Sequence, residues 1–222
     1  MKKMIVTIII LFIIFISMVI YRNMEKENEL KVDEINKIEE YIGKIYGWKE
    51  ITNEALPEFD DINNAEEKWI WNSIRENLSD FEVEYAQLEN KIKELYGTNL
   101  KKQYPKEGTE FIKYDEENKK YRINEILLDA VKDSYLLNKI DKNNNGYTVE
   151  IIEYLVDYTN EDDGKIIIKD LNEKIIKELT TEEATESNIK KIVKDNTDAF
   201  NKKKITLEKE NENIIIKKVE KE

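Results

Sequence analysis

The spacing of apolar residues changes near residue 98, and this change constrains the fold most. Before it, apolar residues recur at helical intervals, as in Ile35, Ile38, Ile42 and Ile45, which precede Gly47. After it, short apolar runs alternate with a period of two and are separated by turn residues. Helices followed by strands are typical of an α+β domain. The sequence therefore predicts helices packed on a curved, mainly antiparallel sheet.

Further helices are predicted before residue 98. One spans residues 64 to 78, where Trp69 falls nearly opposite the apolar face, so Trp69 is either covered by a second layer or exposed as an anchor for a partner. The next begins at the box Ser79-x-x-Glu82 and stops at Gly97.

The strands after residue 98 are predicted to pair as hairpins. The pairs are EFIKY with KKYRI, SYLLNKI with YTVEIIEYLVDY, and KIIIK with KIIKEL. A helix over residues 186 to 200 and a closing hairpin, KKITLEKE with NIIIKKV, complete the chain. Residues 32–222 are long enough to bury one core as a single domain.

An uncharged apolar run over residues 4 to 20 predicts a transmembrane helix of about residues 4–21. A cleaved signal peptide is the alternative, but no pair of small residues marks a cleavage site after the run. We therefore expect residues 1–22 to be an uncleaved signal anchor, followed by a polar stalk over residues 23–31.

Charge predicts the orientation and the partners. Lys2 and Lys3 precede the apolar run, which keeps the N-terminus in the cytoplasm and places residues 32–222 outside a cell membrane that is crossed once. The net charge of -12 predicts repulsion from nucleic acid and anionic lipid headgroups. The expected partners are the membrane, through residues 4–21, and an envelope protein.

The chain contains no His and no Cys. This excludes Ser-His-Asp and Cys-His nucleophiles, His-ligated metals, iron-sulfur clusters and disulfides. It also excludes the cysteine by which bacterial lipoproteins are acylated.

Three short motifs suggest chemistry and are better explained by structure. Residues 141 to 146 open like an EF-hand calcium loop, but the twelfth position is Ile152 instead of a bidentate Glu, so a hairpin turn is predicted. The acidic residues 161 to 163 predict a solvated loop, and the S-x-x-K match at residues 187 to 190 predicts a helix start. We expect no metal, no cofactor and no assigned catalytic residue.

The strand YTVEIIEYLVDY changes apolar phase between Ile151 and Ile152. Such a change indicates either a β-bulge or burial on both faces. We expect the second face of this strand to meet the helices that carry Trp71 and Ile92. The predicted ligand pocket consists of Trp71, Ile92, Ile152, Tyr154 and Val156.

The layout resembles membrane-anchored NTF2-like (cystatin-like) extracytoplasmic domains of Gram-positive bacteria. The resemblance rests on the anchor, on the helix ends YIGKIYG (41 to 47) and KIKELYG (91 to 97), and on the strands SYLLNKI and YTVEIIEYLVDY. It implies a concave sheet closed by helices around an apolar pocket, usually for binding. The sequence thus favours a non-enzymatic, membrane-tethered binding or assembly module. The alternative is a cell-envelope hydrolase that uses a carboxylate pair in a pocket.

Overall fold

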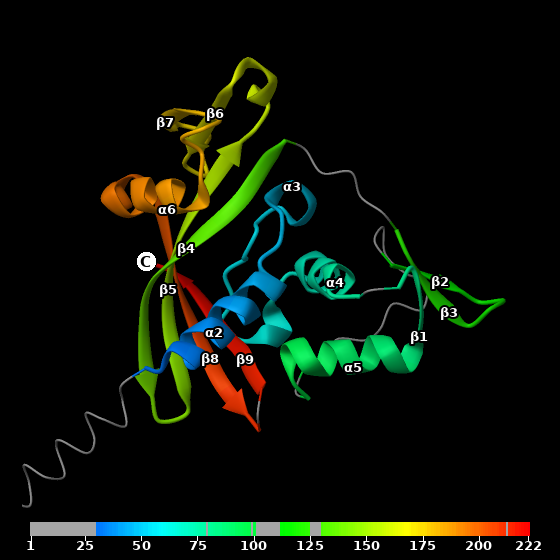
Figure 1. Ribbon diagram of the computed structural model, residues 1–222. Coiled ribbons are helices and arrows are strands. Elements are labelled where there is room, and N and C mark those ends of the chain that lie inside the picture. Colours follow the sequence, from blue (N-terminus) through cyan, green and yellow to red (C-terminus); the bar gives the residue numbers. More distant parts are fainter. Residues whose placement is uncertain (1–29, 79, 99, 101–111, 125–129, 212) are drawn as a thin grey trace, which may run out of the picture.

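The computed structural model describes residues 30–78, 80–98, 100, 112–124, 130–211 and 213–222, and their fold is α+β with antiparallel sheets (Figure 1). The predicted anchor over residues 4–21, most of the stalk and Ser79 lie outside the described residues. In the described ranges, no helix combines the length and apolar character needed to cross a bilayer.

The predicted elements occur in the predicted order. The helices are α2 (Val32–Ile45), α3 (Lys49–Thr52), α4 (Glu67–Glu76), α5 (Tyr85–Tyr96) and α6 (Glu186–Asp195). The strands are β1 (Glu82–Glu84), β2 (Ile112–Asp115), β3 (Lys120–Ile123), β4 (Val131–Asn143), β5 (Gly146–Asp157), β6 (Lys165–Lys169), β7 (Ile175–Thr180), β8 (Asn201–Glu210) and β9 (Asn213–Lys221). Of these, α3 and β1 are two additional elements that the sequence did not predict. All four predicted hairpins are confirmed, with β2–β3 described from Ile112 onward.

Two expected helix boundaries differ: α6 ends at Asp195 instead of residue 200, and the helix that ends at Gly97 starts later than expected. Residues from Glu82 to Glu84 do not begin a helix, because they form β1 and pair with β3 in a small sheet of order β1-β3-β2. The helix α5 begins only at Tyr85, and it ends at Gly97 as predicted. Gly97 has a φ of 75°, a conformation that favours glycine at a helix end.

The large sheet is organised around β5. Strand β4 pairs with β5 over its whole length, from Val131 opposite Asp157 to the turn at Asn143 and Gly146. The other edge of β5 pairs first with β8 and then, near its end, with β6. Strands β7 and β9 lie at the two ends of the strand order β7-β6-β5-β8-β9.

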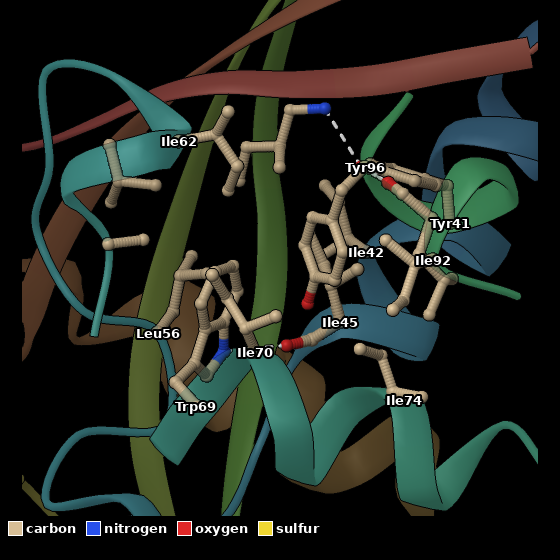
Figure 2. Packing of buried hydrophobic residues seen from close by; sticks show 14 of the residues in the cluster. Tyr41, Ile42, Ile45, Leu56, Ile62, Trp69, Ile70, Ile74, Ile92 and Tyr96 are labelled. Carbon is tan, nitrogen blue, oxygen red and sulfur yellow. Dashed lines mark hydrogen bonds between the residues drawn. The ribbon is translucent and has the colours of Figure 1, made fainter. Parts of the chain in front are cut away.

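A first hydrophobic core lies between α2, α4, α5 and one face of the large sheet. Figure 2 shows Trp69 and Ile70 of α4 next to Ile42 and Ile45 of α2. Trp69 is fully buried, and its indole nitrogen donates a hydrogen bond of 2.8 Å to the carbonyl oxygen of Ile45. Of the two alternatives for Trp69, cover by a second layer of structure is therefore the correct one.

A second hydrophobic core lies on the opposite face of the large sheet, between α6 and the strands β5, β6 and β7. Its buried members are Ile152, Tyr154, Val156, Ile166, Ile168, Leu179, Ile189, Val193 and Phe200. In Figure 1, α6 and the β6–β7 hairpin lie at the end of the long strands away from α5. The sheet is thus covered on opposite faces at its two ends.

This arrangement corrects the predicted faces of β5. Tyr147, Val149 and Ile151 belong to the first core with Trp71 and Ile92, whereas Ile152, Tyr154 and Val156 belong to the second core. The prediction that the second set meets the helices of Trp71 and Ile92 is wrong. The register of β5 with β8 is continuous from Gly146 to Glu153, so the change of phase records a change of covered face. The irregularity in the ladder lies in β4, between Leu137 and Lys139.

The loop that resembles a calcium site is a hairpin turn, as predicted. The pair Asn145-Gly146 suits the positive φ of a tight turn, but the φ of Gly146 is not positive, and a Cβ at this position would overlap the carbonyl oxygen of Leu207 in β8. Gly146 therefore allows the close approach of two strands.

Candidate functional site

A pocket of about 430 Å³ opens where α2, β4 and α6 meet, at the junction of the two cores. This volume lies in the range of roughly 300–1,000 Å³ that is typical of small-molecule sites. The lining consists of Glu39, Gly43, Tyr46, Gly47, Trp48, Asp133, Ser134, Tyr135, Tyr154, Glu186 and Lys190.

Helix α2 and the turn after it supply one wall. The apolar face of α2 carries Ile38, Ile42 and Ile45 into the first core. Glu39, Gly43 and Tyr46 follow each other at intervals of four and three along the neighbouring face, and these three residues line the pocket. Gly43 leaves space there, because a Cβ at this position would already lie 3.3 Å from the hydroxyl of Tyr135.

The second wall uses both faces of the β4–β5 ladder. Tyr135 pairs with Glu153, and Ser134 pairs with Tyr154. Neighbouring residues of a strand point to opposite faces, so Tyr135 shares a face with Glu153 and Tyr154 lies on the other face. Both tyrosines line the pocket, which therefore wraps around the edge of β4.

Two tyrosine hydroxyls are held by the protein. The Tyr46 hydroxyl lies 3.1 Å from the carbonyl oxygen of Ser134 and 3.2 Å from Oε1 of Glu153, and the Tyr135 hydroxyl donates to the carbonyl oxygen of Glu39 at 3.1 Å. The two rings are in contact, with centroids 4.7 Å apart. Burial raises the pKa of both phenols, so both stay neutral at physiological pH.

The hydroxyl of Tyr154 differs from those of Tyr46 and Tyr135 in its hydrogen bonding. Tyr154 is only 4% exposed and packs edge-on against Phe200, yet its hydroxyl makes no hydrogen bond to any residue in the described part of the chain. Burial raises the pKa of Tyr154 to about 12, and the nearby charge of Lys190 partly opposes this rise. Tyr154 thus presents a neutral phenol in the lining.

A lysine joins the two helices beside the pocket. Lys190 lies 2.7 Å from Glu186, one turn earlier in α6, and 3.5 Å from Glu39 of α2. The hydrogen bond to Glu186 raises the pKa of Lys190, so the ammonium stays charged. Asp133 is held from another side, since its Oδ2 accepts a hydrogen bond of 2.7 Å from the backbone nitrogen of Lys49.

A buried ion pair lies behind Tyr46. Glu153 is 1% exposed, and its Oε2 lies 3.4 Å from Nζ of Lys203, whose side chain is 6% exposed. Lys203 also contacts Glu54 at 2.9 Å and the carbonyl oxygen of Leu56. Burial raises the pKa of Glu153, and Lys203 opposes the rise. Glu153 is outside the pocket lining.

Of the predicted pocket residues, only Tyr154 lines this pocket. Trp71 and Ile92 are in the first core, and Ile152 and Val156 are in the second. The sequence reasoning missed Tyr46, Tyr135, Glu186 and Lys190. The spacing of Glu186 and Lys190 indicated an ion pair on a helix. No pattern indicated that this pair would lie next to α2, where Glu39 is 151 residues away from Lys190 along the chain.

Within the described residues, no group of three or more carboxylates is placed to hold a metal ion. Comparison with known proteins gives no match to a protein-family model, a curated protein or a solved structure. The function is therefore inferred from the pocket and the sequence.

Proposed function

We infer that the chain is a membrane-tethered, extracytoplasmic binding or assembly module without enzymatic activity, anchored by residues 4–21 and related to NTF2-like domains. Its ligand, or a group of its protein partner, enters the pocket between α2, β4 and α6. One observation carries this proposal: a concave site of about 430 Å³ is lined by Tyr46, Trp48, Tyr135 and Tyr154. Aromatic lining with a few polar groups is typical of binding sites.

The carboxylates of the pocket support binding over catalysis. A general acid or base must reach the reacting proton within hydrogen-bond distance. Glu39 and Glu186 are both engaged by Lys190. The buried carboxyl with a raised pKa, Glu153, is behind the Tyr46 hydroxyl and paired with Lys203.

The alternative is a cell-envelope hydrolase, and the presence of Glu39, Asp133 and Glu186 in one lining favours it. Glycoside hydrolysis commonly uses two carboxylates on either side of the scissile bond. Release of reducing ends from purified cell walls, lost in Glu39→Gln and Glu186→Gln, would establish this alternative in place of binding.

Blocking the pocket tests the binding function. Gly43→Leu places a side chain into the pocket from the exposed side of α2, and Asn36→Leu adds the same side chain at an exposed position of α2 outside the lining. In membranes that carry the full-length chain, chemical cross-links to its partner or ligand should be lost in Gly43→Leu and kept in Asn36→Leu. Equal cross-linking of the two variants would refute a role for the pocket.

Protease accessibility tests the topology. Protease added to intact protoplasts should degrade residues 32–222 and spare a small anchor fragment, because the positive charges precede the apolar run. Full protection of the domain would refute the topology. A mature N-terminus between residues 18 and 30 would show that the anchor is cleaved.

A further inference from the structure

The charges of the pocket lining favour a cation. The lining has three acidic side chains, Glu39, Asp133 and Glu186, against one basic side chain, Lys190, which leaves a net charge of -2 at neutral pH. The ammonium of Lys190 is already matched by Glu186 at 2.7 Å and Glu39 at 3.5 Å. An anion entering the pocket would meet this excess of negative charge.

The aromatic groups favour the same kind of ligand. The hydroxyls of Tyr46 and Tyr135 are both taken up by protein oxygens, so these residues offer aromatic surface to a ligand. Trp48 adds a further ring to the lining. Aromatic rings attract cations through the negative potential of their faces, and this attraction strengthens when water is excluded.

The hydroxyl of Tyr154 is a third feature, independent of the charges. Tyr154 is only 4% exposed, and it lines the pocket. Its hydroxyl makes no hydrogen bond with any of the described residues. This hydroxyl can therefore donate to, or accept from, a polar group that a ligand carries beside its cation.

We propose that the pocket binds an organic ammonium group, held between the rings of Tyr46, Trp48 and Tyr135 and the carboxylates of Glu39 and Glu186, as part of a larger small molecule. This inference rests on the proposed binding function and names its ligand class. Lys190 competes for the same carboxylates. The cation of the ligand would therefore take over contacts that Lys190 makes in the empty pocket.

Three probes of similar shape test the charge of the ligand. The full-length chain, in a maltoside detergent that carries no ammonium group, is titrated calorimetrically with choline, with its neutral carbon isostere 3,3-dimethylbutan-1-ol, and with the anion 3,3-dimethylbutanoate. Choline should bind at least about tenfold more tightly than the isostere. The anion should bind more weakly than both.

Two variants and two control variants locate the site. Lys190→Met removes the competing cation, so it should tighten choline binding by about threefold or more. Gly43→Leu should abolish binding, and Asn36→Leu should leave it unchanged. The exposed substitution Glu161→Gln, in the loop before β6, is the charge control and should also leave binding unchanged.

Several outcomes would overturn the ammonium ligand. They are isostere or anion binding as tight as choline binding, choline binding that survives Gly43→Leu, choline binding that weakens in Lys190→Met, and no binding of choline. Binding of the isostere or the anion that is lost in Gly43→Leu would overturn the ligand class and leave the binding function standing. If none of the three probes binds and the cross-links are unchanged in Gly43→Leu, both the ligand class and the binding function of the pocket would be refuted.

Discussion

Replacing Lys203 with Met should be among the most damaging substitutions in β8, although Lys203 lies between two other lysines in the sequence. Its side chain is 6% exposed and neutralises Glu153, which is 1% exposed. Removing one partner of a buried ion pair leaves a buried charge without compensation, which costs about 3–5 kcal/mol. Glu54 contributes little to this figure because it is 54% exposed.

The cost of Lys203→Met should fall as the pH is lowered. Burial raises the pKa of Glu153 above its ordinary value of 4.5, and Lys203 opposes the rise, so the pKa climbs further when Lys203 is removed. A carboxyl with a raised folded-state pKa stabilises the native state below its unfolded pKa and loses that contribution as the pH rises through the folded value. The penalty should therefore be largest near pH 7.5 and smaller by roughly 1–2 kcal/mol near pH 5.

Urea denaturation of the full-length chain, followed by the fluorescence of the buried Trp69 and Trp71, measures this cost. Lys204→Met is the matched control, because Lys204 is the exposed neighbour in the same strand, and it should cost about 0.5 kcal/mol or less. The double variant Lys203→Met with Glu153→Leu removes both charges and should recover most of the loss. Equal costs at Lys203 and Lys204, or a cost of Lys203→Met that grows on acidification, would refute the reasoning.

Three further predictions concern the second core, the N-terminus of α2 and the loop at residue 141. Ile152→Ala should cost about 2–5 kcal/mol because Ile152 is fully buried under α6, whereas Glu150→Ala should cost about 0.5 kcal/mol or less; similar losses in urea melts would contradict the assigned burial. The pKa of Glu34 is lowered to about 2, chiefly by the hydrogen bond from the hydroxyl of Tyr147 at 2.8 Å. The contribution of the Glu34 carboxylate to the free energy of unfolding is therefore present above pH 4.5 and is lost as the pH falls through about 2. Glu34→Gln should therefore cost about 1–2 kcal/mol at pH 7 and progressively less in melts towards pH 3, and a constant difference would count against a stabilising role of this hydrogen bond. Millimolar calcium should leave the thermal midpoint unchanged; a rise of several degrees that disappears in Asp141→Ala would restore the calcium site.

Local chemistry was enough to predict most of the elements. The intervals of Ile38, Ile42 and Ile45 determine which side of α2 is buried, and Gly97 determines where α5 ends. The start of α5 could not be found in the same way. The residues from Glu82 to Glu84 pair with β3, about 40 positions later, and this pairing competes with a helix that they would otherwise extend.

The faces of β5 show the limit of reasoning from one strand. Alternation correctly separated Val149 from Ile152, but it carries no information about which layer covers each face. Only the position of α6 on the opposite side of the sheet from α2 decides this. The candidate site has the same origin, because a pocket lies between elements and its lining shares no sequence window.

The sequence by itself determined the order of helices and hairpins, the absence of histidine and cysteine chemistry, and the net negative charge, because each of these depends on residue identity or on spacing within a few residues. The tertiary structure alone decided that Tyr46, Tyr135 and Tyr154 meet around the edge of β4 and that Lys190 joins α6 to α2. It also decided that Lys203, one of three consecutive lysines, is buried against Glu153. These contacts join residues about 50 to 150 positions apart, and their free energy depends on distances and burial that exist only once the whole sheet and both helical layers have assembled.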